Sequence, residues 1–378
     1  MNPRFLPAFV AACAIGIMGC NDVSWPSERN VTTLRILGVK AEPASLMPGQ
    51  STSLSLLCAD GIHGGQSDPT CNFDPSDPKS GPIEVAWFGG CNNPPNNDPL
   101  KCLNAIDAAS SGLSPTLSDT PATAQFAVAP NFEFTAPSEI LQGEVTLAGQ
   151  AIHYGVSYVF FIACAGRLQR IDGVTDRLPA ECRDPSTNGL LDPSRAVTGY
   201  TTIYTYSSFE NTNPFPSNVR FGDVAGNGVP VDSAPAISCS SDADCNEQKP
   251  GQHLWACRLR DSRCLPVTSP CDTSNPQSCQ PSCIDFQLPI QSFLLTVNGN
   301  AIKDPKKSLW AENYTNAGHV PDDARFGLTP PEGNEMTVTS PCAYWQAPPF
   351  ATDEARIWIV VRDDRGGIGW LEQQILVR

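Results

Sequence analysis

The sequence has few basic residues and no cluster of them. Lys and Arg together number 24 against 39 Asp and Glu, which gives a formal net charge of −15 and a pI near 4.6. Nucleic-acid binding requires clustered Lys and Arg side chains to neutralise phosphates. We therefore expect no nucleic-acid partner, and we interpret the acidic surface as a contribution to solubility.

The sequence also lacks the local motifs of common enzyme classes. It contains no Gly-x-Ser-x-Gly elbow, His-Glu-x-x-His helix, Walker loop or dinucleotide fingerprint. Asp363 and Asp364 are adjacent, but glycoside hydrolysis needs two carboxyl groups that face each other across a cleft. We expect both to be solvated turn residues, and we predict no catalytic residues. A hydrolase that acts on glycans through carboxylates from separate strands is the alternative.

No Cys-x-x-Cys pair occurs and the four histidines show no ligand spacing, so we predict no metal site. Calcium is the one cofactor that the sequence leaves open. Asp242, Asp244 and Glu247, or Asp322 and Asp323, could supply hard oxygen ligands. Neither stretch has the Asp-x-Asp-x-Asp-Gly loop that would make a calcium site specific, so we expect no cofactor.

The first twenty residues predict the compartment. Arg4 supplies a short basic region, residues 5–18 are almost wholly apolar, and Ile-Met-Gly-Cys at residues 17–20 resembles a bacterial lipobox. That resemblance implies a signal peptide at residues 1–19 and a diacylglyceryl thioether on Cys20. An ordinary secretory signal with an incidental cysteine is the alternative.

The lipid would make the membrane a partner of the protein, with residues 20–32 as a tether. No second apolar run of about 18 residues follows, so the sequence predicts no membrane-spanning helix after the signal. We expect the protein in the cell envelope, anchored in the outer membrane. Anchoring in the inner membrane is the alternative, because an acid near the lipid site, such as Asp22, can mark retention there in some bacteria.

Cysteine usage supports export independently of the signal. Cys13 would leave with the signal and Cys20 would carry the lipid, so fourteen of the sixteen cysteines remain (16 − 2 = 14). They form two even sets, each of which can close as disulfides in an oxidising compartment. The first set is Cys58, Cys71, Cys91, Cys102, Cys164 and Cys182, and the second is Cys239, Cys245, Cys257, Cys264, Cys271, Cys279, Cys283 and Cys342.

Short segments of alternating polar and apolar residues, punctuated by 36 Pro and 29 Gly, predict an all-β fold. We predict two immunoglobulin-like β-sandwich domains, at residues 33–208 and 209–378. Residues 209–214, which end in the Asn213-Pro214 step, predict a linker between them, because the conformation required before a proline disfavours a continuing regular element. Residues 355–377 predict a hairpin whose two glycines supply the turn.

Cys58, Trp87 and Cys164 resemble the Cys, Trp, Cys arrangement of immunoglobulin-like domains. The resemblance implies a disulfide from Cys58 to Cys164 between the two sheets, with Trp87 packed against it. The sequence departs from the pattern at Ile162, where a tyrosine would form the tyrosine corner. A generic sandwich with unrelated disulfides is the alternative.

Residues 238–283 form a cysteine-dense insertion in the second domain. Cys239, Cys245, Cys257 and Cys264 are similar in spacing to small Dickkopf-type cysteine-rich modules. Such a short segment cannot build a sufficient core without disulfides. We expect interleaved bonds, Cys239 with Cys257 and Cys245 with Cys264, because crossed bonds tie every loop to its neighbour. We also expect the insertion to be peripheral.

Three stretches together resemble the surface lipoproteins of myxobacteria and their relatives. They are LRILGVKAEP at residues 34–43, Asn213-Pro214, and RDDRGGIGW at residues 362–370. The resemblance implies an architecture and a location but no activity. We therefore expect an envelope-anchored lipoprotein with a binding or structural role. The sequence does not identify its ligand, for which a protein and a glycan are the two candidates.

Overall fold

The computed structural model covers the two β-rich halves of the chain. The residues that it describes are 29–60, 66–68, 83–120, 122–123, 125–147, 150–222, 229–230, 238–248, 255–258, 262–272, 274, 279, 281–303, 307–321, 325–331 and 335–378. The predicted signal peptide, Cys20, Asp322 and Asp323 lie outside these residues.

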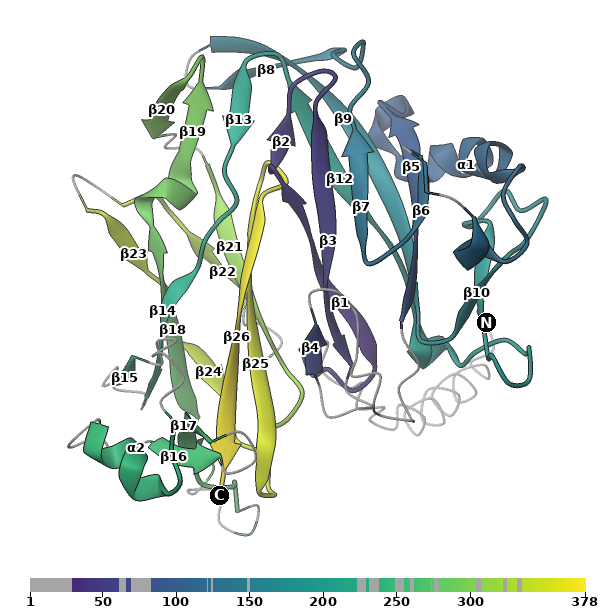
Figure 1. The fold of residues 1–378 in the computed structure, drawn as a ribbon. Coiled ribbons are helices and arrows are strands. Elements are labelled where there is room, and N and C mark those ends of the chain that lie inside the picture. Colours follow the sequence, from purple (N-terminus) through teal and green to yellow (C-terminus); the bar gives the residue numbers. More distant parts are fainter. Residues whose placement is uncertain are drawn as a thin grey trace, which may run out of the picture.

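The fold is all-β, as the alternating pattern predicts (Figure 1). The described α-helices are short: α1 (Leu103–Ser110) and α2 (Asp242–Gln248). Among the residues that the structure describes, no helix has the length and apolar content needed to cross a bilayer.

Two sheets, here called sheets I and II, form the first half of the molecule. Their facing sides bury a core around Trp87, whose ring stacks on Phe132 at 5.9 Å and contacts Phe161 at 5.7 Å. Sheet I contains β1 (Leu34–Glu42), β3 (Ser51–Asp60), β4 (Gln66–Asp68) and β7 (Asn131–Thr135). Sheet II contains β2 (Ser45–Leu46), β12 (Ala196–Tyr206), β9 (Gln150–Cys164), β5 (Glu84–Asn92), β6 (Phe126–Val128) and β8 (Gly143–Leu147).

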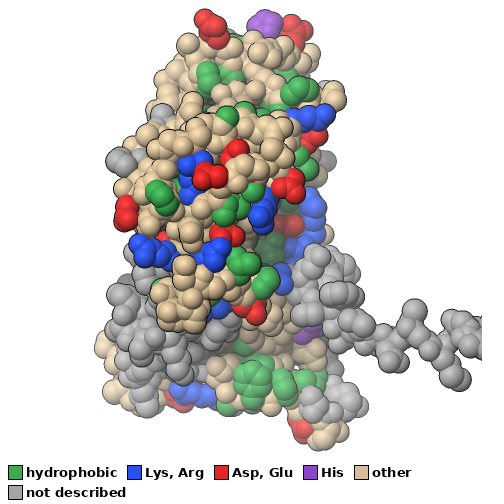
Figure 2. Space-filling view, turned by 90° about the vertical axis from the view of Figure 1, so that its right-hand side faces the viewer, with side chains coloured by type: hydrophobic (Ala, Val, Ile, Leu, Met, Phe, Trp, Pro, Cys, Tyr) green, Lys and Arg blue, Asp and Glu red, His purple; other side chains and the backbone are tan. Residues whose placement is uncertain are grey.

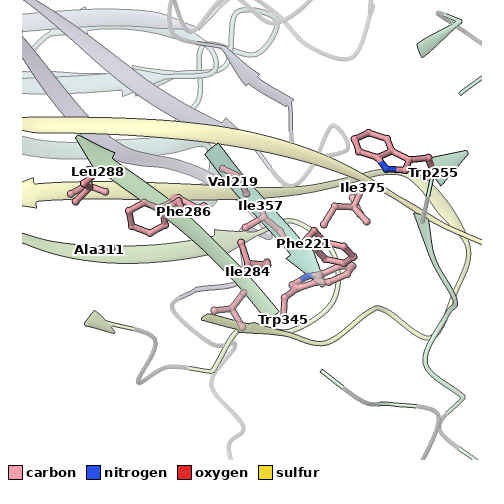
Figure 3. Close-up of a cluster of buried hydrophobic side chains, with 14 of the residues drawn as sticks. Val219, Phe221, Trp255, Ile284, Phe286, Leu288, Ala311, Trp345, Ile357 and Ile375 are labelled. Atoms are coloured by element: carbon pink, nitrogen blue, oxygen red, sulfur yellow. The ribbon is translucent and has the colours of Figure 1, made fainter. Parts of the chain in front are cut away.

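Two further sheets, III and IV, form the second half. Figure 3 shows their shared core, in which Phe286 and Trp345 of sheet IV meet Ile357 of sheet III. Sheet III contains β16 (Trp255–Arg258), β17 (Arg263–Thr268), β26 (Ile368–Val377), β25 (Thr352–Asp363), β21 (Leu309–Thr315) and β22 (Arg325–Leu328). Sheet IV contains β15 (Val229–Pro230), β14 (Ser217–Gly222), β18 (Ser282–Pro289), β23 (Thr337–Thr339) and β24 (Ala343–Trp345).

The two halves share a third apolar core, which stacks the four sheets in the order II, I, III, IV. Leu37 and Leu57 on the outer side of sheet I pack against Trp358, Val360 and Ile368 on the outer side of sheet III. Figure 1 shows β1 and β3 lying beside β25 and β26. Both faces of β25 are therefore buried, and the two halves are joined by a hydrophobic interface.

Smaller elements flank this stack. One is a three-stranded sheet of β13 (Phe209–Asn211), β19 (Leu294–Val297) and β20 (Asn300–Lys303). The hairpin of β10 (Arg167–Arg170) and β11 (Ala180–Arg183) packs with α1 on the outer side of sheet II. Phe209, Leu295 and Val297 of the β13 sheet pack against Ile152 and Tyr206 of sheet II.

The predicted bond between Cys58 and Cys164 is wrong. Cys164 bonds to Cys182 of β11 instead. Successive side chains of a strand point to opposite faces. Cys164 lies in the outer cluster with Leu168, whereas Cys58 lies in the core between sheets I and II, so sheet II separates the two sulfurs. Cys58 is disulfide-bonded elsewhere.

The cysteine-rich segment has the expected interleaved bonds, Cys239 with Cys257 and Cys245 with Cys264. It is part of the second half's core, contrary to our expectation of a peripheral insertion. Its strand β17 pairs in parallel with β26, and Trp255 is buried in the core between sheets III and IV. Cys271 and Cys279 form a further bond, while Cys283, the predicted end of the insertion, lies in β18 and bonds to Cys342.

Candidate functional site

Three polar side chains from distant parts of the chain meet where the two halves join. Asn211 ends β13, Lys307 lies just before β21, and Asp363 ends β25. We call these residues the junction triad. The turn after β25 fixes the carboxylate of Asp363, because its Oδ1 accepts from the backbone N–H of Arg365 at 2.9 Å and of Gly367 at 2.7 Å.

The other atoms of the junction triad contact one another directly. Lys307 Nζ lies 3.1 Å from Asp363 Oδ2 and donates to Asn211 Oδ1 at 2.8 Å. Asn211 Nδ2 donates to the same Asp363 Oδ2 at 2.9 Å. The side chains of Lys307 and Asp363 have no exposed area. Each group of the junction triad therefore touches the other two, out of contact with water.

Asp363 therefore differs from the solvated turn residue that its sequence predicts. Its neighbour Asp364 is closer to that expectation, with 39% of its side chain exposed. Partial burial nevertheless raises the pKa of Asp364, and the nearby Asp363 adds to the rise. Burial lowers the pKa of Lys307, although the attraction of Asp363 opposes this effect.

The predicted linker is a well-bonded segment. Asn211 N donates to Ser45 Oγ at 2.7 Å, and Asn213 Nδ2 donates to the carbonyl of Ala41 at 2.7 Å. The N–H of Ile368 in turn donates to Asn213 Oδ1 at 2.9 Å. The segment therefore bridges the two halves, because its side chains bond to both of them.

A group of aromatic side chains lies on the outer face of sheet II. Five of the seven tyrosines in the chain belong to β9 and β12, and we call them the tyrosine surface. Their rings contact one another at centroid distances of 5.7 to 6.4 Å. The members are Tyr154, Tyr158, Tyr200, Tyr204 and Tyr206.

Exposure varies along the tyrosine surface. Tyr200 is 52% exposed, whereas Tyr158 and Tyr206 are buried. Burial raises the pKa of Tyr158, Tyr204 and Tyr206, so these hydroxyls stay protonated at neutral pH. Tyr200 therefore presents an amphipathic ring to solvent on a support of packed aromatic rings, which include Phe160 at 5.8 Å.

A hollow of about 260 Å³ lies beside α1, over the edge of sheet II. Phe88, Ile106 and Phe126 line it together with Ser110 and Gln125, and no acidic side chain is among its lining residues. Figure 2 shows the face of the molecule on this side, where hydrophobic side chains gather in small groups among acidic and basic ones. The hollow offers apolar contacts and a few hydroxyl and amide groups.

The carboxylates proposed for calcium are used within the protein. Asp244 Oδ2 accepts from the N–H groups of Ser240 and Ser241, and these bonds lower the pKa of Asp244. Asp242 Oδ1 accepts from Cys257 N at 2.8 Å. The side chain of Glu247 lies outside the described residues. The two described carboxylates therefore stabilise the start of α2 and its contact with β16.

The sulfur atoms of Cys239, Cys245 and Cys257 lie within 4.8 Å of one another. All three are disulfide-bonded, so they offer no thiolate to a metal. Their closeness reflects the two crossed bonds of the cysteine-rich segment.

The junction triad could not be predicted from the sequence, because nothing local distinguishes Asn211 or Lys307 from surface residues. The tyrosine surface could have been found. Tyr200, Tyr204 and Tyr206 occupy even-numbered positions of one strand, and this spacing places them on one face.

Comparisons with known proteins leave the chain without an assigned family. No family model matches it, and no curated protein matches it. A solved structure of the adhesin InvE from Yersinia pseudotuberculosis aligns with 91% of this chain at 9% identity and a TM-score of 0.17. This chain spans 60% of that chain's length. A likeness of this strength supports no conclusion about fold or function.

Proposed function

We propose that the protein is a lipoprotein anchored in the outer membrane by Cys20, and that it binds an envelope partner through the tyrosine surface. The observation that carries the binding role is the half-exposed ring of Tyr200 on a rigid, aromatic-packed sheet. Tyrosine gives large contact area at low conformational cost, and its hydroxyl adds a hydrogen bond. The partner is a protein or a glycan, because aromatic surfaces of this kind bind both.

The scaffold suits this role. A binding surface on strands is held more precisely than one on loops. Behind the tyrosine surface, the core around Trp87 supports sheet II, and the Cys91–Cys102 and Cys164–Cys182 disulfides fix β5 and β9 to the segments that pack on its outer side. The lipid would attach the protein to the membrane. The predicted tether, residues 20–32, is wrong at its end, because Val31 is buried in the third core and its N–H donates to the carbonyl of Thr315 at 2.7 Å.

The alternative, a hydrolase acting on glycans, needs two carboxyl groups across a cleft. The acid most deeply buried among the described residues is Asp363, whose charge is balanced by Lys307. The hollow beside α1 has no acidic lining residue. These observations favour binding over hydrolysis.

Binding can be tested with envelope fractions and a matched pair of variants. Tyr200→Ala removes the exposed ring of the tyrosine surface, and Tyr344→Ala removes a ring of β24 that is 45% exposed in the other half. We expect Tyr200→Ala to weaken retention by roughly tenfold, the effect of about 1.4 kcal/mol at one aromatic contact. Tyr344→Ala should bind like the unchanged protein.

Treating the fractions with protease or with periodate separates a protein partner from a glycan partner. Equal retention of both variants and the unchanged protein would refute binding through the tyrosine surface. Membrane attachment is measured separately, by removing the lipidated cysteine.

A further inference from the structure

The junction triad places an amine beside the carbonyl carbon of a carboxamide. Lys307 Nζ lies 2.8 Å from Asn211 Oδ1. Since a C=O bond is about 1.23 Å long, Nζ lies at most about 4.0 Å from Asn211 Cγ (2.8 + 1.23). Groups held near attack distance, about 3 to 3.5 Å, react as if at very high concentration.

We propose that Lys307 and Asn211 join in an intramolecular isopeptide bond, with Asp363 carrying the proton between them. Asp363 is placed for this task because its Oδ2 lies 3.1 Å from the attacking nitrogen and 2.9 Å from the leaving nitrogen of Asn211. One carboxylate oxygen therefore touches both atoms between which a proton must move.

The reaction begins with the charged pair. Lys307 gives a proton to Asp363 Oδ2, which leaves a neutral amine and a neutral carboxylic acid. The nitrogen lone pair of Lys307 attacks Asn211 Cγ, and the C=O electrons move onto Oδ1 to give a tetrahedral intermediate.

The intermediate then collapses. The C=O bond re-forms and the bond from Cγ to Nδ2 breaks, while Asp363 passes its proton to Nδ2 and takes the second proton of the attacking nitrogen. Ammonia leaves with that proton as ammonium, and Asp363 is again a carboxylate. The positive charge of Lys307 leaves with the ammonium, and no oxidant or other reactant is needed.

The surroundings favour the neutral amine that the first step requires. Burial lowers the pKa of Lys307, and the guanidinium of Arg365 lowers it further. That guanidinium is held 5.7 Å from the ring centre of Phe209, next to the junction triad. A buried ion pair is expensive to form, because both charges lose water. Forming the amide removes the ammonium charge, and the carboxylate of Asp363 keeps the N–H groups of Arg365 and Gly367 as hydrogen-bond donors.

An exposed ion pair between a lysine and a carboxylate lacks two features of the junction triad, burial and a neighbouring carboxamide. Lys40 Nζ lies 2.8 Å from Glu42 Oε2, but their side chains are 34% and 65% exposed. No carboxamide is bonded to Lys40 Nζ among the contacts of the described residues. The junction triad differs because it combines a buried amine, an amide carbon and a proton carrier.

The bond would close a loop of chain between β13 and β21, since Asn211 and Lys307 are 96 positions apart. It would tie the segment that bridges the two halves to the start of β21 in sheet III. Reduction would not break it, in contrast to the disulfides.

Peptide mapping of the full chain, purified from the envelope, reduced and digested with trypsin, tests the bond. Trypsin does not cut after an acylated lysine, so the bond yields residues 196–220 joined to residues 307–325. This product is lighter than the two peptides by about 17 Da, the mass of the ammonia that aminolysis releases. The unjoined peptides 196–220 and 308–325 from folded protein would overturn the proposal.

Two variants test the roles within the junction triad. Asp363→Asn keeps the size of the side chain but cannot carry the proton, so we expect the joined peptide to be lost. Lys40→Arg is the control, and the joined peptide should persist. Intact disulfides in the Asp363→Asn variant would show that it folds, and a joined peptide at full yield would overturn the role of Asp363. The peptide map of the unchanged protein tests whether the bond exists, independently of both variants.

Discussion

Two adjacent valines test whether the interface between the halves is a true core. Val360 and Val361 lie side by side in β25, and neither has exposed area. Val360 faces sheet I in the third core, whereas Val361 faces sheet IV inside the second half. Substituting each with alanine removes the same atoms from opposite faces of one strand.

The expected cost follows from the buried volume. Valine to alanine removes two carbon groups worth about 0.8 kcal/mol each, and the remaining cavity brings the total to about 2 kcal/mol. Because the halves are expected to unfold together, the cooperative unit is larger than about 250 residues, and this loss then lowers Tm by about 4 °C or less. We expect Val360→Ala and Val361→Ala to destabilise the protein equally.

Calorimetry of the oxidised full chain measures both variants. If the halves merely touch, Val360 behaves as a surface residue, and its substitution changes the free energy of unfolding by less than about 0.5 kcal/mol. That result for Val360→Ala, together with the full loss for Val361→Ala, would refute the four-sheet stack. Equal losses would show that the halves unfold with a shared core.

Three further predictions concern the anchor, the cysteine-rich segment and alkaline pH. Cys20→Ala should release the protein from the membrane fraction with its thermal transition unchanged, and unchanged partitioning into detergent would contradict the anchor. Replacing residues 238–266 by a Gly-Ser linker should lower Tm by more than a few degrees, because it removes buried Trp255 and most of β17; an unchanged transition would show that the segment is peripheral. Burial raises the pKa of Tyr206, so the stability that it contributes is fully present below the unfolded pKa of about 10 and falls as pH rises above it. We compare denaturant midpoints at about pH 9 and pH 11, roughly one unit below and one unit above the unfolded pKa. The midpoint of Tyr206→Phe should fall less between these two pH values than the midpoint of the unchanged protein, and an equal fall in both proteins would count against this explanation.

Local patterns predicted much of the fold. The alternation at residues 355–362 and the glycines after them predict a buried hairpin, and β25 and β26 form it. The interleaved bonds of Cys239 and Cys245 also follow from a local argument about short loops. In each case the deciding information lies within a few residues or within one small segment.

Long-range information was missing where the predictions failed. Cys164 was paired wrongly because a strand's sequence does not say which of its two faces is the core, and a shift of one residue exchanges them. Asp363 was expected in solvent because its turn is polar. Its burial depends on Asn211 and Lys307, and Asn211 is 152 positions away.

The interface between the halves has a consequence for synthesis. Leu37 and Leu57 belong to strands made early, whereas their partners Trp358 and Ile368 lie in β25 and β26, the last two strands of the chain. Chains are made from the amino end, and earlier units fold first. A nascent chain whose first half has folded therefore exposes the apolar outer face of sheet I to solvent until β25 and β26 have been synthesised. We expect chains ended before β25 to aggregate or to be held by chaperones, and a monomeric, soluble truncation would contradict this order of assembly.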